Sequence, residues 1–373
     1  MKRLHTLVLC AILLLVYNGC AWAQEAPEVA ARGAVLVDRA SGRILYNHDM
    51  NEMLPMASTT KIMTALLAFE NGNLDQMVTA GPNASGVTGT SIYLSEGEQL
   101  SMSDMLKGLM LQSGNDAAVA IAEHLGGSVE NFAEMMNRRA RELDADANFV
   151  TPNGLDAEGH GASALGMARI ACAAMEIPEF RELVSTQRAT IPWVDHEYKR
   201  VLTNKNRLLK EYPGATGIKT GYTSKAGRCL VFSAERDGME LVGVVLNCGE
   251  WFEAAQRMLD WGFDTFKPVE VMQGGIQPLK ADVKGGKTGQ VAVRAQEGIT
   301  IPVKVGDQYQ LYYELPRNVA APVSEGQWLG TAWVELNGEK LSEVDLVAAG
   351  SVDKGGFAHA FLRVLRSFFH IGI

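Results

Sequence analysis

The stretch KAGRCLVFSAERDGMELVGVVLNC, residues 225–248, contains two apolar runs that are joined across Asp237 and Gly238. An Asp-Gly pair between two such runs is a strong signal for a tight β-hairpin, so the stretch predicts two antiparallel strands. Nearer the start of the chain, GAVLVDRASGRILYNHD (residues 33–49) alternates apolar side chains around an Ala-Ser-Gly turn and predicts a second hairpin. Strands are therefore expected at both ends of this part of the chain.

Helical patterns fill most of the sequence between and after the hairpins. Apolar residues at helical spacing occur in 57–72, in two segments of 101–127 that are broken at residues 113–115, in 128–144 and in 253–266. The order of strands, helices and strands predicts an α/β fold, with a helical subdomain inserted into an antiparallel sheet. A doubly wound parallel sheet does not fit this order.

The texture of the sequence changes from about residue 267 to residue 350. Short alternating runs are separated there by Gly, Pro and Asn, which predicts a small all-β domain. A chain of 373 residues is also longer than one domain usually is. We therefore expect a first domain over residues 24–264 and a β-rich domain over residues 265–350.

Residues 1–23 have the features of a secretory signal peptide. The chain starts with two basic residues, continues with an apolar run from Leu7 to Val16, and has small residues at Ala21 and Ala23. Cleavage is expected before Gln24. The alternative is an uncleaved membrane anchor, but the apolar run is short for crossing a bilayer.

Residues 351–373 predict an amphipathic helix. Large apolar residues recur on one side at helical spacing, and the basic residues are Lys354, Arg363 and Arg366. A basic amphipathic helix at the end of an acidic protein is typical of an anchor that lies in a membrane surface. The alternative is a helix that packs on its own domain.

Composition excludes several classes of protein. The net charge of −9 argues against a nucleic acid partner. The three cysteines beyond the signal peptide, Cys172, Cys229 and Cys248, are expected to be buried thiols, with a bridge between the last two as the alternative. No zinc motif or clustered histidines occur, so no metal or cofactor is expected.

Three short motifs could carry chemistry. In PMASTTKIMT, Ser58 precedes Lys61 by three residues, which places both side chains on one helical face. A neutral amine at that distance can take the proton of a serine nucleophile. A second match, Ser351 to Lys354, lacks any supporting context.

The second motif is Ser113-Gly114-Asn115, a hydroxyl and a carboxamide at a break between helical segments. The third is Lys219-Thr220-Gly221, where a cation and a hydroxyl could hold an anionic group and the glycine would let another backbone approach closely. The same tripeptide recurs at residues 287–289, where the flanking glycines predict a solvated hairpin turn. Order and distance from the first two motifs favour the copy at residues 219–221.

The ordered set of Ser-x-x-Lys, Ser-x-Asn and Lys-Thr-Gly resembles the penicillin-interacting serine acyl enzymes. The sequences around the motifs extend the resemblance. They are residues 31–70, 113–140 and 217–247, and DWGF at 260–263. These stretches resemble low-molecular-mass penicillin-binding proteins, which are D-alanyl-D-alanine carboxypeptidases of the peptidase S11 family. The resemblance covers essentially the whole mature chain and implies a transpeptidase-like α/β domain followed by a small β-rich domain.

The resemblance implies a role for each motif residue. Ser58 would be the nucleophile that forms an acyl-enzyme, and Lys61 would be its general base, with a pKa lowered by burial and by the charge of Lys219. Ser113 would pass the proton to the departing D-alanine. The residues expected to bind substrate are Asn115, Lys219, Thr220, Gly221, Tyr222 and Lys205.

These residues have distinct expected tasks. Lys219 and Thr220 would meet the terminal carboxylate of the substrate, with Lys205 near it, and Asn115 would hold the substrate amide. The backbone N–H groups of Ser58 and Tyr222 would form the oxyanion hole. The chain departs from the family at Asn153, where many relatives have His, and at Gly166, where they have an acidic residue. Both departures bear on the water that completes the reaction.

The resemblance implies a secreted serine carboxypeptidase that removes the terminal D-alanine from peptidoglycan pentapeptides and is acylated by β-lactam antibiotics. The alternatives are an endopeptidase or transpeptidase on the same fold, a serine β-lactamase, and an inactive scaffold that binds the cell wall. A class A β-lactamase needs a Glu between the second and third motifs. The sequence Glu335–Asn337 resembles that β-lactamase motif, but it follows the third motif instead of preceding it. An inactive scaffold is disfavoured because all three motifs are intact.

Overall fold

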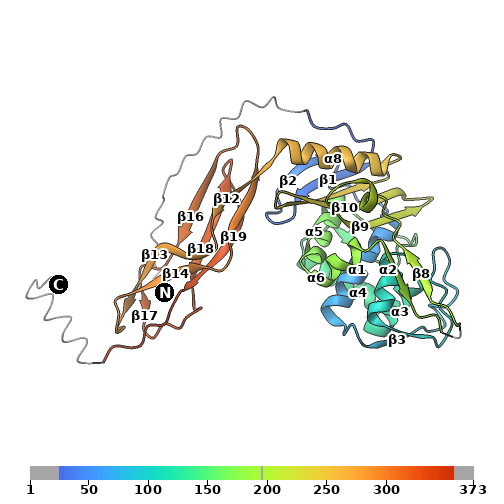
Figure 1. Ribbon diagram of the computed structural model, residues 1–373, viewed down its shortest axis with the longest axis horizontal. Helices are drawn as coiled ribbons and strands as arrows, with labels where there is room; N and C mark the ends of the chain where they lie inside the picture. Colours follow the sequence, from blue (N-terminus) through green and yellow to red (C-terminus); the bar gives the residue numbers. More distant parts are fainter. Residues whose placement is uncertain (1–24, 195, 357–373) are drawn as a thin grey trace, which may run out of the picture. The chain divides into compact units, whose positions relative to one another are not determined.

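The computed structural model describes residues 25–194 and 196–356. The chain divides into two compact units, with the boundary between Thr265 and Phe266 (Figure 1). Each unit contains its own cluster of buried apolar side chains. The two units are therefore described separately.

A five-stranded antiparallel sheet forms the centre of the first unit, in the order β2-β1-β11-β10-β9. Both predicted hairpins are present, as β1 with β2 and as β10 with β11. Asp237 and Gly238 in the second turn have positive φ angles of 52° and 78°, the geometry that favours an Asp-Gly pair. The strands are β1 (Gly33–Asp38), β2 (Ile44–His48), β9 (Ala215–Thr223), β10 (Gly227–Arg236) and β11 (Met239–Leu246).

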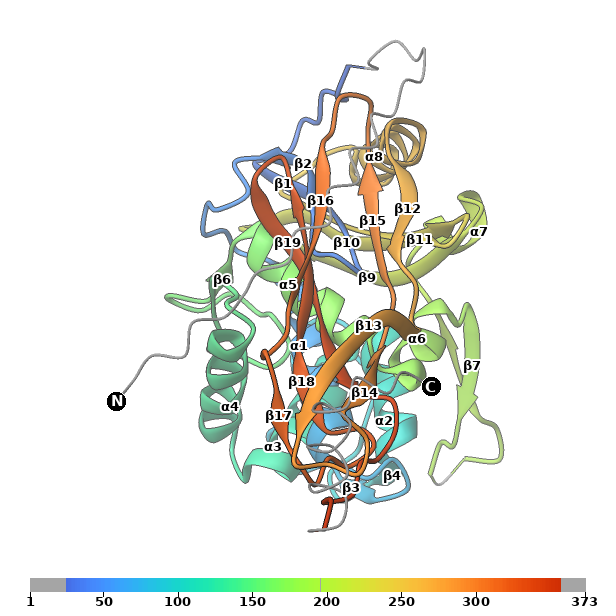
Figure 2. The same cartoon turned by 90° about the vertical axis from the view of Figure 1, so that its left-hand side faces the viewer.

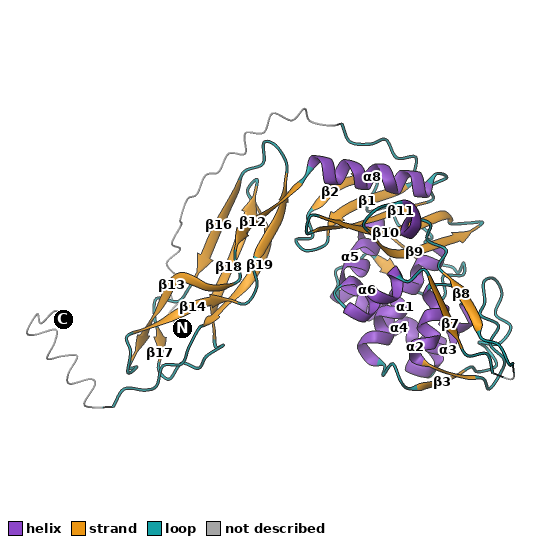
Figure 3. Ribbon diagram, in the orientation of Figure 1, coloured by secondary structure: helices purple, strands orange, loops and turns teal. Residues whose placement is uncertain are grey.

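Helices cover both faces of this sheet (Figure 3). On one face, α8 (Trp251–Thr265) packs so closely that Gly262 lies against Leu36 and Leu241. On the other face, α5 (Ala164–Met175) packs on β1 and β11. Every residue of β11 is buried as a result. Its sequence is therefore apolar rather than alternating, except at Glu240, which forms an ion pair with Arg39.

The helices up to residue 142 form the block that was predicted between the hairpins, whereas the three helices described within residues 164–211 were not predicted. The α/β class is confirmed. The predicted break at residues 113–115 falls between the end of α2 and the start of α3. The helices are η1 (Ala57–Thr60), α1 (Lys61–Asn71), α2 (Met102–Met110), α3 (Asn115–Gly126), α4 (Val129–Glu142), α6 (Pro178–Ser185) and α7 (Leu208–Glu211). The short strand pairs are β3 (Met77–Thr79) with β4 (Gln99–Ser101), β5 (Ala147–Asn148) with β6 (Gly161–Ala162), and β7 (Arg188–Ile191) with β8 (Arg200–Thr203).

The second unit is built from strands, as the alternating runs predict (Figure 2). A six-stranded sheet has the order β16-β18-β19-β14-β13-β17, and β12 pairs with β15. Only β17 runs parallel to its neighbour, β13. The strands are β12 (Lys267–Met272), β13 (Gly275–Lys284), β14 (Gln290–Ala295), β15 (Ile299–Val303), β16 (Tyr309–Glu314), β17 (Val319–Ala320), β18 (Trp328–Leu336) and β19 (Glu339–Ala348).

The prediction that a helix begins at residue 351 is wrong for residues 351–356. Val352 forms a β-bridge with Val323, and Lys354 forms one with Gly286, so this segment is extended and belongs to the β-rich unit. Backbone pairing with two neighbouring segments outweighs the local pattern here. The rest of the predicted helix, residues 357–373, lies outside the described residues, as do residues 1–24.

Within the described ranges, no helix combines the length and the apolar character needed to cross a bilayer.

Candidate active site

The Ser-x-x-Lys motif lies where η1 runs into α1. Ser58 belongs to η1, and Lys61 is the first residue of α1. The Nζ atom of Lys61 lies 2.9 Å from Ser58 Oγ, as their spacing predicts. Ala57, directly before the serine, has a φ of 48°. Non-glycine residues seldom adopt this left-handed conformation, and such residues cluster at functional sites.

Lys61 is completely buried. Besides the serine, its Nζ contacts Asn115 Oδ1 at 2.7 Å and the backbone carbonyl oxygen of Asn153 at 2.6 Å. Burial holds the pKa of Lys61 well below its usual value, and the charges of Lys219 and Lys205 lower it further. The amine beside the serine is therefore far easier to deprotonate than an exposed lysine.

The Ser-x-Asn motif spans the link between α2 and α3. Ser113 is buried with a φ of 65°, and its backbone carbonyl accepts a hydrogen bond of 2.8 Å from Thr90 Oγ1. Asn115 donates its side-chain amide to Thr88 O at 2.6 Å. Because Thr88 O can only accept, the oxygen of the Asn115 side chain must face Lys61.

The Lys-Thr-Gly motif at residues 219–221 lies on β9, the edge strand of the sheet. Lys219 is only 2% exposed, and its Nζ donates to Ser113 Oγ at 3.0 Å and to its neighbour's carbonyl, Thr220 O, at 2.9 Å. Burial, followed by the charge of Lys205, lowers the pKa of Lys219 to about 7. The three motifs are thus brought together by side-chain contacts.

Gly221 lets β9 approach the serine closely. A Cβ atom at this position would lie 2.9 Å from Ser58 N and 3.0 Å from both Met56 O and Thr59 N. Real Cβ atoms essentially never come closer than 3.0 Å to such atoms, so any larger residue would push the strand away. Glycine therefore keeps the backbone of β9 beside the backbone N–H of Ser58.

The two remaining sequence-predicted residues are exposed. Tyr222 is 64% exposed and directly follows Gly221 on β9. Lys205 is exposed as well, yet its charge lowers the pKa of both Lys61 and Lys219. The structure therefore places Lys205 within electrostatic reach of the buried lysines.

The two departures from the family pattern have structural explanations. The side-chain oxygen of Asn153 accepts a hydrogen bond from Leu155 N at 3.0 Å, while its backbone carbonyl faces Lys61. At Gly166, a Cβ atom would lie 2.5 Å from Asp146 O. An acidic side chain has no room there unless the backbone moves.

His160 has a structural role in this site. Its Nδ1 accepts a hydrogen bond from Val150 N at 3.0 Å, so its Nε2 carries the proton and donates to Thr60 Oγ1 at 3.0 Å. The threonine hydroxyl donates in turn to Ala57 O at 2.8 Å. Burial lowers the pKa of His160 to about 4, so the neutral ring holds the turn that carries the serine.

Asp116 is a buried residue beside the site that the sequence reasoning missed. Its buried carboxylate accepts hydrogen bonds from Ser91 Oγ at 2.5 Å, from Ile92 N at 3.1 Å and from Leu94 N at 3.0 Å. These bonds fix the loop that packs beside Asn115. Its position directly after the Ser-x-Asn motif is a signal that could have identified it.

A buried ion pair holds the same loop from the other side. Arg200 on β8 binds Glu98 through two hydrogen bonds, of 2.6 Å and 2.8 Å, and both side chains are almost fully buried. The guanidinium also donates to Tyr93 O at 2.9 Å. Nothing in the sequence pairs two residues that lie this far apart along the chain.

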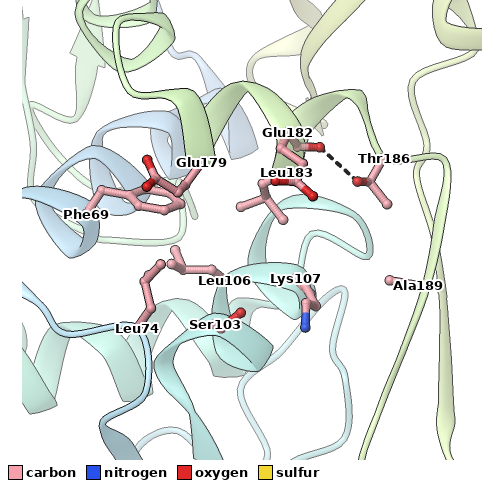
Figure 4. A pocket seen from close by; sticks show the side chains of 10 residues that line it. All are labelled: Phe69, Leu74, Ser103, Leu106, Lys107, Glu179, Glu182, Leu183, Thr186 and Ala189. Carbon is pink, nitrogen blue, oxygen red and sulfur yellow. Dashed lines mark hydrogen bonds between the residues drawn. The ribbon is translucent and has the colours of Figure 1, made fainter.

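A pocket of about 200 Å³ lies elsewhere in the first unit, between α1, α2, α6 and β7 (Figure 4). Its apolar lining includes Phe69, Leu106 and Leu183, and Thr186 Oγ1 donates to Glu182 O at 2.8 Å. None of the motif residues lines it. The pocket is therefore separate from the site described above.

Cysteines and metal ligands add nothing to the site. All three cysteines in residues 25–194 and 196–356 are free thiols, and Cys229 and Cys248 form no bridge. Burial raises the pKa of the Cys229 thiol to about 11, which makes it unreactive. Over the same ranges, no group of three or more His, Cys, Asp or Glu side chains is arranged to hold a metal ion.

Comparisons with known proteins agree with this geometry. Residues 21–249 match the D-alanyl-D-alanine carboxypeptidase family Peptidase_S11, and residues 266–354 match the C-terminal domain of penicillin-binding protein 5. The chain is 35% identical to D-alanyl-D-alanine carboxypeptidase DacF of Bacillus subtilis, over 96% of each protein. It is 34% identical to DacC of Escherichia coli, over 89% of this chain and 87% of DacC.

A solved structure shows the same architecture. Penicillin-binding protein 5 of Haemophilus influenzae is 31% identical, with a TM-score of 0.73 over 89% of this chain and 100% of the other. The resemblance inferred from the motifs is thus confirmed. The chain belongs to the peptidase S11 family of D-alanyl-D-alanine carboxypeptidases.

Proposed function

We propose that this protein is an exported serine-type carboxypeptidase that removes the terminal D-alanine from peptidoglycan stem peptides. The reaction passes through an acyl-enzyme on Ser58, and β-lactam antibiotics acylate the same serine. The observation that carries the proposal is the 2.9 Å contact between Ser58 Oγ and the buried Lys61 Nζ. Membership of the family supports the same reaction and substrate class.

Lys61 acts as the general base in its neutral form. A neutral amine has two N–H bonds and one lone pair. Asn115 Oδ1 and the Asn153 carbonyl can only accept, so they take the two N–H bonds. The lone pair is then left for Ser58, whose hydroxyl donates to Nζ and loses its proton as the oxygen attacks the peptide carbonyl.

The substrate is held at both ends of the scissile bond. Lys219 and Thr220 meet the terminal carboxylate, with the exposed Lys205 adding positive charge nearby. The carbonyl oxygen turns toward the backbone N–H groups of Ser58 and Tyr222. Gly221, directly before Tyr222, supports this assignment because it lets β9 approach Ser58 N closely. Each such donor contributes roughly 10²–10³ in rate.

The proton then moves to the leaving group. Lys61, now protonated, lies in the same site as Ser113, whose hydroxyl also contacts Lys219. Ser113 passes a proton to the D-alanine nitrogen as the C–N bond breaks, and takes one from Lys61 in exchange. Lys61 is neutral again and activates the water that releases the shortened peptide, since neither Asn153 nor Gly166 supplies a base.

A serine β-lactamase is disfavoured as the alternative. The look-alike Glu335 lies on β18 in the β-rich unit, not on a loop of the first unit. Transfer to an amine acceptor would use the same acyl-enzyme. It is kept as a side activity, since no contact in the site favours an amine over water.

The decisive experiment measures D-alanine release from a pentapeptide that ends in D-Ala-D-Ala. Ser58→Ala should abolish release. Ser351→Ala is the matched control, because it removes the serine of the second Ser-x-x-Lys match, which lies in extended chain. Release that persists in Ser58→Ala, or that is lost in Ser351→Ala, would contradict the proposal.

Export and membrane attachment are part of the same proposal. The signal peptide of residues 1–23 supports export, and the amphipathic pattern of residues 357–373 supports attachment to the membrane surface. Deleting residues 357–373 should move the protein from the membrane to the soluble fraction while pentapeptide hydrolysis continues. Unchanged partitioning would reject the anchor.

A further inference from the structure

The β-rich unit carries a groove of about 780 Å³ that the catalytic proposal does not use. Its lining includes the exposed ring of Trp328, the side chains of Arg317 and Asn318, and the carboxylates of Glu314 and Glu343. Aromatic, basic, amide and acidic groups are therefore gathered in one concave surface. Such a mixture of an apolar surface with placed polar groups is typical of small-ligand sites.

Trp328 is the principal apolar surface in the groove. It is 59% exposed although it lies on β18, which has a neighbouring strand on each side in the six-stranded sheet. The indole Nε1–H donates a hydrogen bond of 2.9 Å to Asp345 Oδ1 on the neighbouring β19. The ring is thus held in place by its edge while it stays open to solvent.

The same face of the sheet also carries a pair of stacked aromatic rings. Tyr312 on β16 is paired with Trp333 on β18, and the two rings stack at 5.5 Å with an angle of 13° between their planes. Since side chains alternate between faces along a strand, Thr331 shares the face of Trp333. The cross-strand partner of Thr331 is Asp345, the residue that holds Trp328.

Acidic side chains lie between these rings. Glu314 is the partner of Thr331 on β16, and Glu343 is the partner of Trp333 on β19. Asp345 and Glu335, which accepts from Trp333 Nε1 at 3.3 Å, bring the carboxylates beside the aromatic rings to four. β16, β18 and β19 are neighbours in this sheet (Figure 3), so the arrangement forms one continuous surface, which we call the aromatic face.

We propose that the aromatic face binds the sugar rings of a neutral glycan. A sugar ring presents an apolar face of C–H groups that packs on an aromatic ring, and its edge carries hydroxyl groups. Carboxylates accept hydrogen bonds from hydroxyls, while the Arg317 guanidinium and the Asn318 amide donate to them. The face carries basic groups as well, with Lys284 and Arg317 in the groove and Lys340 beside Trp333 and Glu343. Groups of both signs suit a ligand whose hydroxyls donate as well as accept, whereas an anion would meet carboxylates as well as cations.

The glycan strand of peptidoglycan is the ligand that fits the rest of the protein. This choice of glycan rests on the proposed function, whereas the preference for a neutral sugar follows from the aromatic face alone. The face would hold the polymer to which the stem peptides are attached. None of its residues takes part in the hydrolysis.

The test is a titration of the whole protein with a tetramer of β-1,4-linked N-acetylglucosamine, followed by calorimetry and tryptophan fluorescence. Saturable binding is expected, and Trp328→Ala should weaken it roughly tenfold. Ile276→Ala is the matched control, because Ile276 is a 74% exposed apolar residue of the same unit that does not line the groove. The affinity of Ile276→Ala for the tetramer should equal that of the unchanged protein.

Two further measurements keep the outcomes distinct. Trp328→Phe should restore most of the affinity, which separates the loss of an aromatic surface from a loss of folding. Hydrolysis of a soluble pentapeptide should be unaffected by Trp328→Ala, so failure of the glycan test would leave the catalytic proposal standing. Absent binding, equal binding by Trp328→Ala, or binding of phosphatidylglycerol vesicles in place of the tetramer would overturn the inference.

Discussion

The tripeptide Lys-Thr-Gly occurs once in each unit of this protein, and the two copies have opposite surroundings. Lys219 is 2% exposed, and its Nζ contacts Ser113 Oγ and Thr220 O. The side chain of Lys287 is 53% exposed, and its Nζ pairs with Asp353 Oδ2 at 2.9 Å. Burial lowers the pKa of the first lysine to about 7, whereas the second lysine lies at the surface in an ion pair.

The glycines of the two copies differ just as much. A Cβ atom at Gly221 would meet the backbone of Met56, Ser58 and Thr59, but at Gly289 it would meet no atom within 4 Å. Gly289 lies in the turn between β13 and β14, as the sequence predicts. The contrast shows that the burial and contacts of this tripeptide depend on the elements packed against it, and not on the tripeptide alone. It also supplies matched controls for every position of the motif.

The largest expected difference concerns the lysines. Lys219→Ala should lower the rate of acylation by penicillin roughly 10²–10³-fold, because it removes the cation that contacts Ser113 and is proposed to meet the substrate carboxylate. Lys287→Ala should leave the rate unchanged, since an exposed ion pair contributes little. Stopped-flow measurement of the acylation rate checks both variants. A similar loss of rate in the two would contradict the expected difference between the two copies of the tripeptide.

The glycines should show the next largest difference. Gly221→Ala forces β9 away from η1, and overpacking of this kind costs about 1–3 kcal/mol. If the displaced group is the oxyanion hole, acylation slows roughly ten- to hundredfold. Gly289→Ala adds a methyl group to open space and should be silent. Equal rates for the two alanine variants would show that the close approach at Gly221 has no catalytic role.

The threonines test the carboxylate contact. Thr220→Val removes a hydroxyl that is expected to bind the charged end of the substrate, which should raise KM for the pentapeptide roughly tenfold. Thr288 donates to Gln290 O at 3.2 Å on an exposed turn, so Thr288→Val should leave KM unaltered. Steady-state kinetics of both proteins decide the point. An unchanged KM in Thr220→Val would remove Thr220 from the substrate site.

The smallest expected effect is on stability. Burial lowers the pKa of Lys219 from 10.5 to about 7 in the folded protein. Between these pH values the unfolded chain binds more protons, so stability increases as the pH is raised toward 10.5. At pH 7 the free energy of unfolding of Lys219→Met should therefore be higher than that of the unchanged protein by about 0.5–2 kcal/mol, with a correspondingly higher unfolding temperature. This gain should shrink at higher pH.

Lys287→Met is the control for this effect, since it removes an exposed lysine from an ion pair at the surface. Thermal unfolding at pH 7 and pH 9.5 measures both variants. A Lys219→Met protein that is less stable at pH 7, or a gain that grows with pH, would mean that Lys219 is not strained by burial.

Local patterns in the sequence predicted the parts of the fold that depend on local structure. The Asp237-Gly238 turn and the three-residue spacing of Ser58 and Lys61 each depend on neighbouring residues, and both are present in the structure. Residues 351–356 were predicted wrongly because an amphipathic pattern contains no information on backbone partners such as Val323. Patterns of this kind state what a segment can form, not what it pairs with.

The support of the site was beyond sequence reasoning for the same reason. The third contact of Lys61 is the backbone carbonyl of Asn153. Every residue has such a carbonyl, so the sequence cannot show which one contacts the lysine. The buried pair of Arg200 and Glu98 joins residues that are distant along the chain. The motifs predict which groups react, whereas the surrounding contacts that set the pKa values of those groups come only from the folded chain.

The central claim is that Ser58 is acylated in a site that contains Lys219 and not Lys287. Mass spectrometry of the protein after brief incubation with benzylpenicillin tests it most directly. The account predicts one adduct on the peptide that contains Ser58, retained in Lys287→Ala and greatly reduced in Lys219→Ala. An adduct on any other peptide, or equal labelling of the two lysine variants, would contradict it.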